Sequence, residues 1–324
     1  MVSVQIELRV VPDCPHCRQA AALLRDVLHA AGLTDAGFDT VVIDTDETAT
    51  ALNFPGSPTF AIDGEDIFPQ RHSQPALACR LYQTEHGPRA LPLRDDLLTA
   101  VCARTVEARL AAAQQTHWQQ TYATHPGLYG DQPSDAAKYA AELFSSSGVT
   151  TVLELGGGHG RDALLSARNG LTTHVVDFSA TALQQLSDTA SARGLGSRIA
   201  MIEHDVRAPL PMRSASVDAV FAHMLLCMAL FTNTIRAVVT DVRRVLRPGG
   251  MFVYTVRHTG DAHYRAGISH GDDIYEHGGF AVHYFCRQLV DELAAGWSLI
   301  DVHEFSEGEL PRRLFCVTQA RPAD

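Results

Sequence analysis

Apolar and polar positions in the first third of the chain predict a small α/β unit. Apolar and polar residues alternate over residues 4–10, which is the period of a strand with one buried face. The apolar residues of 20–31 recur at helical spacing, so an amphipathic helix follows. Residues 38–44 and 56–62 predict two further strands, and residues 97–115, rich in Ala, Leu and Arg, predict a helix.

The rest of the chain predicts a longer series of strands. They are expected at residues 152–155, 172–177, 198–205, 217–222, 250–256, 297–305 and 313–318. A helix end is predicted before the fifth of these strands, stopped by Pro248 and two glycines. The pattern is typical of an α/β protein with a doubly wound sheet.

A glycine turn follows the strand at 152–155. Gly156, Gly158 and Gly160 precede a helix that opens at Arg161, and glycine permits a tight reversal with close approach of a ligand to the backbone. The next strand ends at Asp177, roughly 20 residues on, where an α/β nucleotide fold places an acid on ribose hydroxyls. The alternative is an ordinary sheet whose glycines only make turns.

Length and composition narrow the class of protein. A chain of 324 residues favours two domains, and 46% hydrophobic with 19% charged residues is typical of a globular protein. No run of eighteen apolar residues occurs, so we expect no membrane partner. The amino terminus lacks a basic segment followed by an apolar core, so we expect a cytoplasmic location.

The charge argues against nucleic-acid substrates. A net charge of -11 does not favour binding to a polyanion, which requires clustered Lys and Arg. The seven cysteines of a chain without an export signal are not expected to form a disulfide framework.

Two of these cysteines form a candidate reactive dithiol. Cys14 and Cys17 open the first predicted helix, where backbone amides and the helix dipole favour thiolate over thiol. Cys14 should react first and Cys17 should resolve, which makes a thiol reductant a possible partner. Thiol exchange and capture of a soft metal or metalloid both use this spacing, and idle cysteines are the alternative.

Five motifs in order give the chain, over about 117–320, a resemblance to the class I S-adenosylmethionine-dependent methyltransferases. They are the glycine turn after Glu154, then Asp177, Asp205 before Val206, residues 216–221 and residues 246–250. The resemblance implies a Rossmann-like fold that ends in an antiparallel strand pair. It also implies S-adenosylmethionine as cofactor, with the glycines at the methionine part, Asp177 at the ribose and Asp205 with Val206 at the adenine. Expected cofactor contacts are Tyr129, Glu154, Gly156, Gly157, Gly158, Gly160, Asp177, Phe178, Asp205 and Val206.

The first part of the chain resembles small thioredoxin- or glutaredoxin-like proteins related to alkylmercury lyase. The resemblance covers about 3–103 and rests on the dithiol, on Pro58 and on residues 76–82. It implies a cis-proline that faces the two cysteines. We therefore expect a thioredoxin-like domain over 1–103, a helical connection over 104–116 and a methyltransferase domain over 117–324.

Three groups of residues are candidates for the acceptor site. Trp118, Tyr122 and Tyr129 form an aromatic segment that would close over the cofactor or simply pack on the sheet. His223, just after the fourth strand, is the candidate base, or else a packing histidine. A loop-forming, histidine-rich insertion after the fifth strand should build the acceptor pocket. Its candidate substrate residues are His258, His263 and Tyr264, and no compact ligand spacing predicts a metal site.

Three functions follow. The first is methylation of a small thiol, selenium or thiophilic metal or metalloid species held by Cys14 and Cys17. The second is O- or N-methylation of a small metabolite, with His223 as base and the first domain as scaffold. The third is a thiol-based redox or metal-handling protein with an idle cofactor fold.

Overall fold

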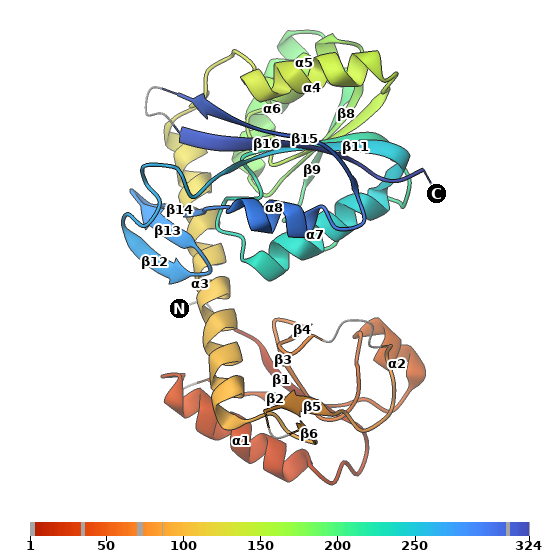
Figure 1. The fold of residues 1–324 in the computed structure, drawn as a ribbon, viewed down its shortest axis with the longest axis vertical. Coiled ribbons are helices and arrows are strands. Elements are labelled where there is room, and N and C mark those ends of the chain that lie inside the picture. Colours follow the sequence, from red (N-terminus) through yellow and green to blue (C-terminus); the bar gives the residue numbers. More distant parts are fainter. Residues whose placement is uncertain (1–3, 34–35, 70–73, 86, 309–311, 324) are drawn as a thin grey trace. The chain divides into compact units, whose positions relative to one another are not determined.

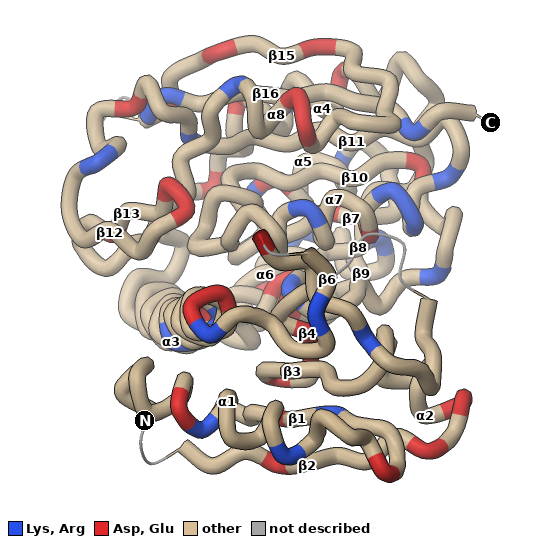
Figure 2. The backbone as a smooth tube through the Cα atoms, turned by 60° about the horizontal axis from the view of Figure 1, so that its bottom comes forward, with Lys and Arg blue, Asp and Glu red and all other residues tan. Residues whose placement is uncertain are grey.

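A computed structural model describes residues 4–33, 36–69, 74–85, 87–308 and 312–323. It divides into two compact units, Met1–Arg109 and Leu110–Asp324. The expected helical connection, residues 104–116, lies within helix α3 (Arg94–Thr124). No helix among the described residues is long and apolar enough to cross a bilayer. Basic and acidic residues are interspersed along both units (Figure 2).

The first unit is built on a four-stranded sheet in the order β2-β1-β3-β4. Its strands are β1 (Ile6–Val10), β2 (Asp39–Val42), β3 (Thr59–Ile62) and β4 (Glu65–Asp66). β2 pairs parallel to β1, and β3 pairs antiparallel to it. The remaining elements are α1 (Cys17–Ala30), α2 (Asp46–Ala51) and the hairpin β5 (Tyr82–Thr84) with β6 (Gly87–Arg89).

The dithiol lies at the start of α1, as the spacing predicts. Cys17 is the first residue of the helix, and its amide donates a hydrogen bond to the Cys14 carbonyl at 3.2 Å. The Ser57-Pro58 peptide bond is cis. The Ser57 hydroxyl accepts a hydrogen bond from the Val11 amide at 3.1 Å, so the segment before the cis bond contacts the chain that leads to Cys14.

The second unit contains a seven-stranded sheet in the order β15-β16-β11-β10-β7-β8-β9 (Figure 1). The strands are β7 (Thr151–Leu155), β8 (Thr172–Asp177), β9 (Ile199–Glu203), β10 (Val217–His223), β11 (Leu246–Arg257), β15 (Ser298–Glu307) and β16 (Arg312–Ala320). The five strands from β9 to β11 pair parallel. β16 pairs antiparallel with β11 and with β15, so the strand pair has the expected direction.

Helices cover both faces of this sheet because its strands are apolar on both sides. α4 (Asp135–Ser146) packs on Val152 and Ala219, and α5 (Arg161–Arg168) and α6 (Ala180–Ala192) pack on Val175. α7 (Thr232–Val245) and α8 (Arg287–Leu293) pack on the alternate residues, which include Leu153 and Val220. A short 3-10 helix, Gly196–Arg198, precedes β9.

Two sequence predictions are corrected here. Helix α7 ends at Val245, and Pro248 lies within β11, where the pairing with β10 shifts register. The proline and its glycines therefore form a strand irregularity rather than a helix end. The insertion predicted as loops forms a three-stranded antiparallel sheet of β12 (Ile268–Gly271), β13 (Ile274–His277) and β14 (Phe280–His283).

Candidate active site

A cavity of about 630 Å³ opens at the carboxyl ends of the parallel strands in the second unit. This is where an open α/β sheet binds its ligand, because the loops after the strands converge there. Of the residues predicted from sequence, those that line it are Tyr129, Glu154, Gly156, Gly157, Gly158, Asp177, Phe178, Val206, His223 and His263. The fold thus gathers residues from positions 129 to 263 at one site.

The glycine turn has the backbone that the sequence predicts. Gly156, Gly158 and Gly160 have positive φ angles of 68°, 54° and 85°. The Gly156 amide donates to the Val176 carbonyl at 2.7 Å, which fixes the turn to the neighbouring strand. Gly160 is the N-cap of α5 and does not line the cavity, so its predicted cofactor contact is corrected to a structural role.

Gly160→Ala should destabilise the protein by about 2–4 kcal/mol. An added Cβ would lie 2.1 Å from Cδ1 of Leu186, which is fully buried and cannot move aside. Gly170→Ala is the matched control, because Gly170 also has a positive φ but has open space around it. It should cost only about 1 kcal/mol. Denaturant unfolding checks this, and equal losses would contradict it.

Asp177 ends β8 at the cavity and is held rigidly. Its two carboxylate oxygens accept hydrogen bonds from the amides of Gly158 and Ser179, both at 2.8 Å. Burial raises the pKa of Asp177, although these amide hydrogen bonds act in the opposite direction. The carboxylate keeps lone pairs for hydroxyl donors from a ligand.

Glu154 is a buried carboxyl that also lines the cavity. No hydrogen bond to its side chain comes from any residue that the structure describes, and burial raises its pKa well above the usual range. A buried carboxyl without a protein partner is costly unless a ligand supplies a donor or a cation. Glu154 therefore fits a ligand that carries an ammonium group.

Three predicted contacts do not reach the cavity. Asp205 turns its carboxylate to Arg207, whose Nε lies 2.9 Å from Oδ1, and the cavity is lined instead by its neighbours His204 and Val206. The buried His258 ring stacks on Phe315 with centroids 4.5 Å apart. The Tyr264 hydroxyl donates to Asp273 at 2.8 Å. The predicted ligand contacts of Asp205, His258 and Tyr264 are therefore corrected.

The aromatic segment covers one side of the cavity. Trp118 and Tyr122, near the end of α3, stack with centroids 5.7 Å apart, and both line the cavity. Tyr129 stacks on His159 at 6.2 Å with an interplanar angle of 16°. Beyond it, the amide and hydroxyl of Ser134 donate to Asp162 at 2.7 and 2.9 Å, which ties the segment to α5. The segment thus packs on the sheet and walls the cavity at once.

His223 ends β10 and lies between a hydroxyl and a carboxylate. Its Nδ1 is 2.9 Å from Oγ1 of Thr255, which also accepts the Met224 amide. Its Nε2 is 3.2 Å from Oε2 of Glu307, within ion-pair distance but at an angle unfavourable for a hydrogen bond. Sequence reasoning missed Glu307, because it belongs to no motif and only marks the end of β15 beside Gly308.

Glu307 is an ionised neighbour for His223. Burial alone would raise the pKa of Glu307, but the adjacent His223 and the charges of Arg161 and Arg312 outweigh burial, so this pKa lies below its usual range. Arg161 Nη2 lies 3.5 Å from Oε1 of Glu307. A carboxylate in this position stabilises a protonated imidazole and so favours proton uptake by His223.

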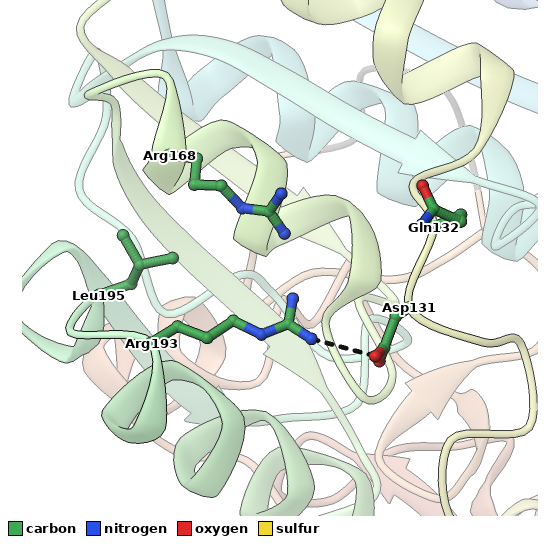
Figure 3. A pocket seen from close by; sticks show the side chains of 5 residues that line it. All are labelled: Asp131, Gln132, Arg168, Arg193 and Leu195. Carbon is green, nitrogen blue, oxygen red and sulfur yellow. Dashed lines mark ion pairs between the residues drawn. The ribbon is translucent and has the colours of Figure 1, made fainter.

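A second cavity, of about 550 Å³, lies elsewhere in this unit (Figure 3). It is lined by Asp131, Gln132, Arg168, Arg193 and Leu195, and Arg193 pairs with Asp131 at 3.2 Å. It contains no nucleophile or paired acids. Groups of three or more His, Cys, Asp or Glu side chains placed to hold a metal ion are absent from the part of the chain that the structure describes.

Comparisons with known proteins agree with this site. Residues 152–250 match the family model of a methyltransferase domain. The chain is 32% identical over 160 residues to a probable methyltransferase, PMT5, from Arabidopsis thaliana. That match covers 47% of this chain and 25% of the relative, so the chain spans only about a quarter of its length.

Two solved structures share the fold. One is 1,6-didemethyltoxoflavin-N1-methyltransferase from Burkholderia thailandensis with S-adenosylhomocysteine, with 17% identity, a TM-score of 0.52 and coverage of 65% of this chain and 88% of that one. The other is the N-methyltransferase NodS from Bradyrhizobium japonicum, with 13% identity, a TM-score of 0.50 and coverage of 64% and 98%. The chain contains a class I methyltransferase domain, and the cofactor of this domain is S-adenosylmethionine.

Proposed function

We propose that the chain transfers a methyl group from S-adenosylmethionine to an oxygen or nitrogen of a small acceptor bound in the 630 Å³ cavity. The observation that carries the proposal is His223 between Thr255 and Glu307 at this cavity. A hydroxyl or protonated amine must lose a proton on methylation, and an imidazole beside a carboxylate can take it.

The cofactor fits the residues at the glycine turn. Asp177 would accept hydrogen bonds from ribose hydroxyls, Glu154 would face the ammonium group, and Val206 with Phe178 would flank the base. When bound, the cofactor supplies an electrophilic methyl carbon on a sulfonium. The residues of the chain have two tasks, to align the acceptor with that carbon and to exclude water.

The proton and the electron pairs then balance. The acceptor heteroatom forms a bond to the methyl carbon, the sulfur–carbon bond breaks, and its electron pair stays on the sulfur. The proton of the acceptor goes to Nε2 of His223, while Thr255 holds Nδ1 and ionised Glu307 stabilises the imidazolium. His223 later returns the proton to solvent.

The test is a transfer assay with cofactor labelled in its methyl group. The protein is incubated with panels of hydroxylated metabolites, amines, thiols and metalloids, and the labelled product is identified. The proposal expects label on a hydroxyl or amine compound. Label on thiols or metalloids alone would contradict it.

Affinity for S-adenosylhomocysteine should tighten as the pH rises from about 5 to about 8. Burial raises the pKa of Glu154 and Asp177, so the free protein retains protons that the unperturbed carboxyls would lose. The ammonium and hydroxyl groups of the ligand favour ionised carboxylates, and binding therefore releases protons. Calorimetry in buffers of different ionisation enthalpy measures this release, and proton uptake would contradict the assignment.

The dithiol supports a second candidate function. We propose that the first unit is a thioredoxin-like domain, because Cys14 and Cys17 open α1 and a cis-proline follows Ser57. Its thiols would hold or reduce a sulfur, selenium or thiophilic metalloid acceptor. With the third hypothesis, an idle cofactor fold, this candidate differs from the main proposal in what the cysteines do.

The double variant Cys14→Ser with Cys17→Ser separates these functions. The main proposal expects turnover of a hydroxyl or amine acceptor to stay within about twofold of wild type, because neither thiol lines the cavity. Abolished turnover would favour the second candidate. Complete absence of cofactor binding by the unaltered protein would favour the third.

A further inference from the structure

One wall of the cavity consists of hydrogen-bond donors. It is formed by the end of β11 and the insertion that follows, and its lining residues include Arg257, His263 and Tyr284. The acidic residues that line the cavity, within the described chain, all lie on other elements: Glu154, Asp162, Asp177 and Glu307. A ligand group at this wall must therefore accept hydrogen bonds.

Arg257 is fixed from behind and presents one nitrogen. Its Nε donates to Oδ2 of Asp261 at 3.0 Å, its Nη2 donates to Oδ1, and its guanidinium lies over the Tyr284 ring at 5.2 Å. Nη1 has no partner among the residues that the structure describes. Because Arg257 is only 9% exposed and lines the cavity, Nη1 is the part of its charge that a ligand can reach.

Asp261 orients Arg257 without using up its charge. The Asp261 side chain is fully buried and also accepts hydrogen bonds from the amides of His263 and Arg313, at 2.8 and 2.9 Å. Burial alone would raise the pKa of Asp261, but the donors from Arg257, His263 and Arg313 outweigh burial and lower it. A carboxylate shared among these donors leaves the outward face of the guanidinium electropositive.

Two neighbours of Arg257 add donors. Nδ1 of His263 lies 3.1 Å from Nη2 of Arg257. A guanidinium only donates, so Nδ1 accepts and the ring proton of neutral His263 is on Nε2. Burial raises the pKa of Tyr284 to about 12, so its hydroxyl stays protonated. Charged, imidazole and phenol donors thus lie on the same wall.

We propose that this wall binds an oxyanion carried by the methyl acceptor, with Arg257 as the specificity-determining residue. The inference rests on the proposed function. Phe280, Val282 and Met228 also line the cavity and would cover an apolar body. The acceptor is accordingly a small acid whose oxyanion lies at Arg257 and whose methylated heteroatom lies at His223. A carboxylate and a phosphate share this chemistry, and the experiment separates them.

The experiment titrates benzoate, phenyl phosphate and neutral benzamide into protein saturated with S-adenosylhomocysteine. Benzoate or phenyl phosphate should bind at least tenfold more tightly than benzamide, and the tighter of the two identifies the anion. Arg257→Gln should weaken binding of that anion roughly 10- to 100-fold and leave benzamide unchanged. Arg257→Lys, which keeps the charge without the planar fork, should lose less.

Arg168→Gln is the matched control, because Arg168 lines the other cavity (Figure 3). It should leave anion binding unchanged. Equal affinity for the acids and benzamide would overturn the inference, whichever variants fold. Competition between the anion and S-adenosylhomocysteine would also overturn it, because the wall would then serve the cofactor. Failure of the unaltered protein to bind S-adenosylhomocysteine would instead overturn the proposed function.

Discussion

Asp177→Ala should weaken binding of S-adenosylhomocysteine about 100-fold or more, which corresponds to about 3 kcal/mol. Asp177 lies at the cavity with both oxygens fixed by backbone amides at 2.8 Å. Hydrogen bonds from ribose hydroxyls to a preorganised carboxylate are charge-assisted, and the variant removes them together. Titration calorimetry measures the loss, and thermal unfolding shows whether the variant is folded.

Asp205→Ala is the control for that result. Sequence alone treats the two strand-end acids alike, but Asp205 is bound to Arg207 and does not line the cavity. Its removal should change the affinity by about threefold or less, because only an exposed ion pair is lost. Equal losses for Asp177→Ala and Asp205→Ala would contradict the assignment of the ribose site.

His223→Gln should lower kcat roughly 100- to 10,000-fold for a hydroxyl or amine acceptor, with affinity for the cofactor product unchanged. Gln can occupy a similar volume but cannot take a proton. Glu307→Gln should lower kcat by about 10- to 100-fold, because the imidazolium loses its counter-charge at 3.2 Å. Single-turnover transfer of the labelled methyl group measures both.

Glu304→Gln is the matched control on the same strand. Glu304 is 54% exposed and pairs with Arg313 at 3.3 Å, so its loss should leave kcat within about twofold. If His223→Gln is as active as wild type, the proton goes elsewhere. An acceptor that attacks as a thiolate would behave in this way, because it needs no base.

The central sheet could be predicted from sequence because each strand is signalled locally. Apolar segments mark β7, β8 and β10, and the glycine turn and Asp177 mark the edge at which they end. The family resemblance added the direction of the final strand pair. These features depend on neighbours in sequence and on the general rules of α/β sheets.

The acceptor side could not be predicted in the same way. β12 reads Ile-Ser-His-Gly and has little apolar periodicity. The turn after it, where Asp272 and Asp273 both have positive φ, was the available signal for a hairpin. Which histidine faces the cavity depends on tertiary packing: His258 stacks on Phe315 from a distant strand, whereas His263 contacts Arg257.

Glu307 shows the same limit. Its partner His223 lies 84 positions earlier in the chain, and only the pairing of β15 with β16 brings the end of β15 near that of β10. A carboxylate at a strand end carries no signal by itself. The catalytic environment of His223 therefore becomes visible only in the assembled fold.

The most direct test is a crystal structure of the full chain with S-adenosylhomocysteine. The account predicts one nucleoside in the 630 Å³ cavity, with its ribose on Asp177, its ammonium at Glu154 and its sulfur facing His223. A nucleoside bound elsewhere, or one whose sulfur faces away from His223, would contradict it.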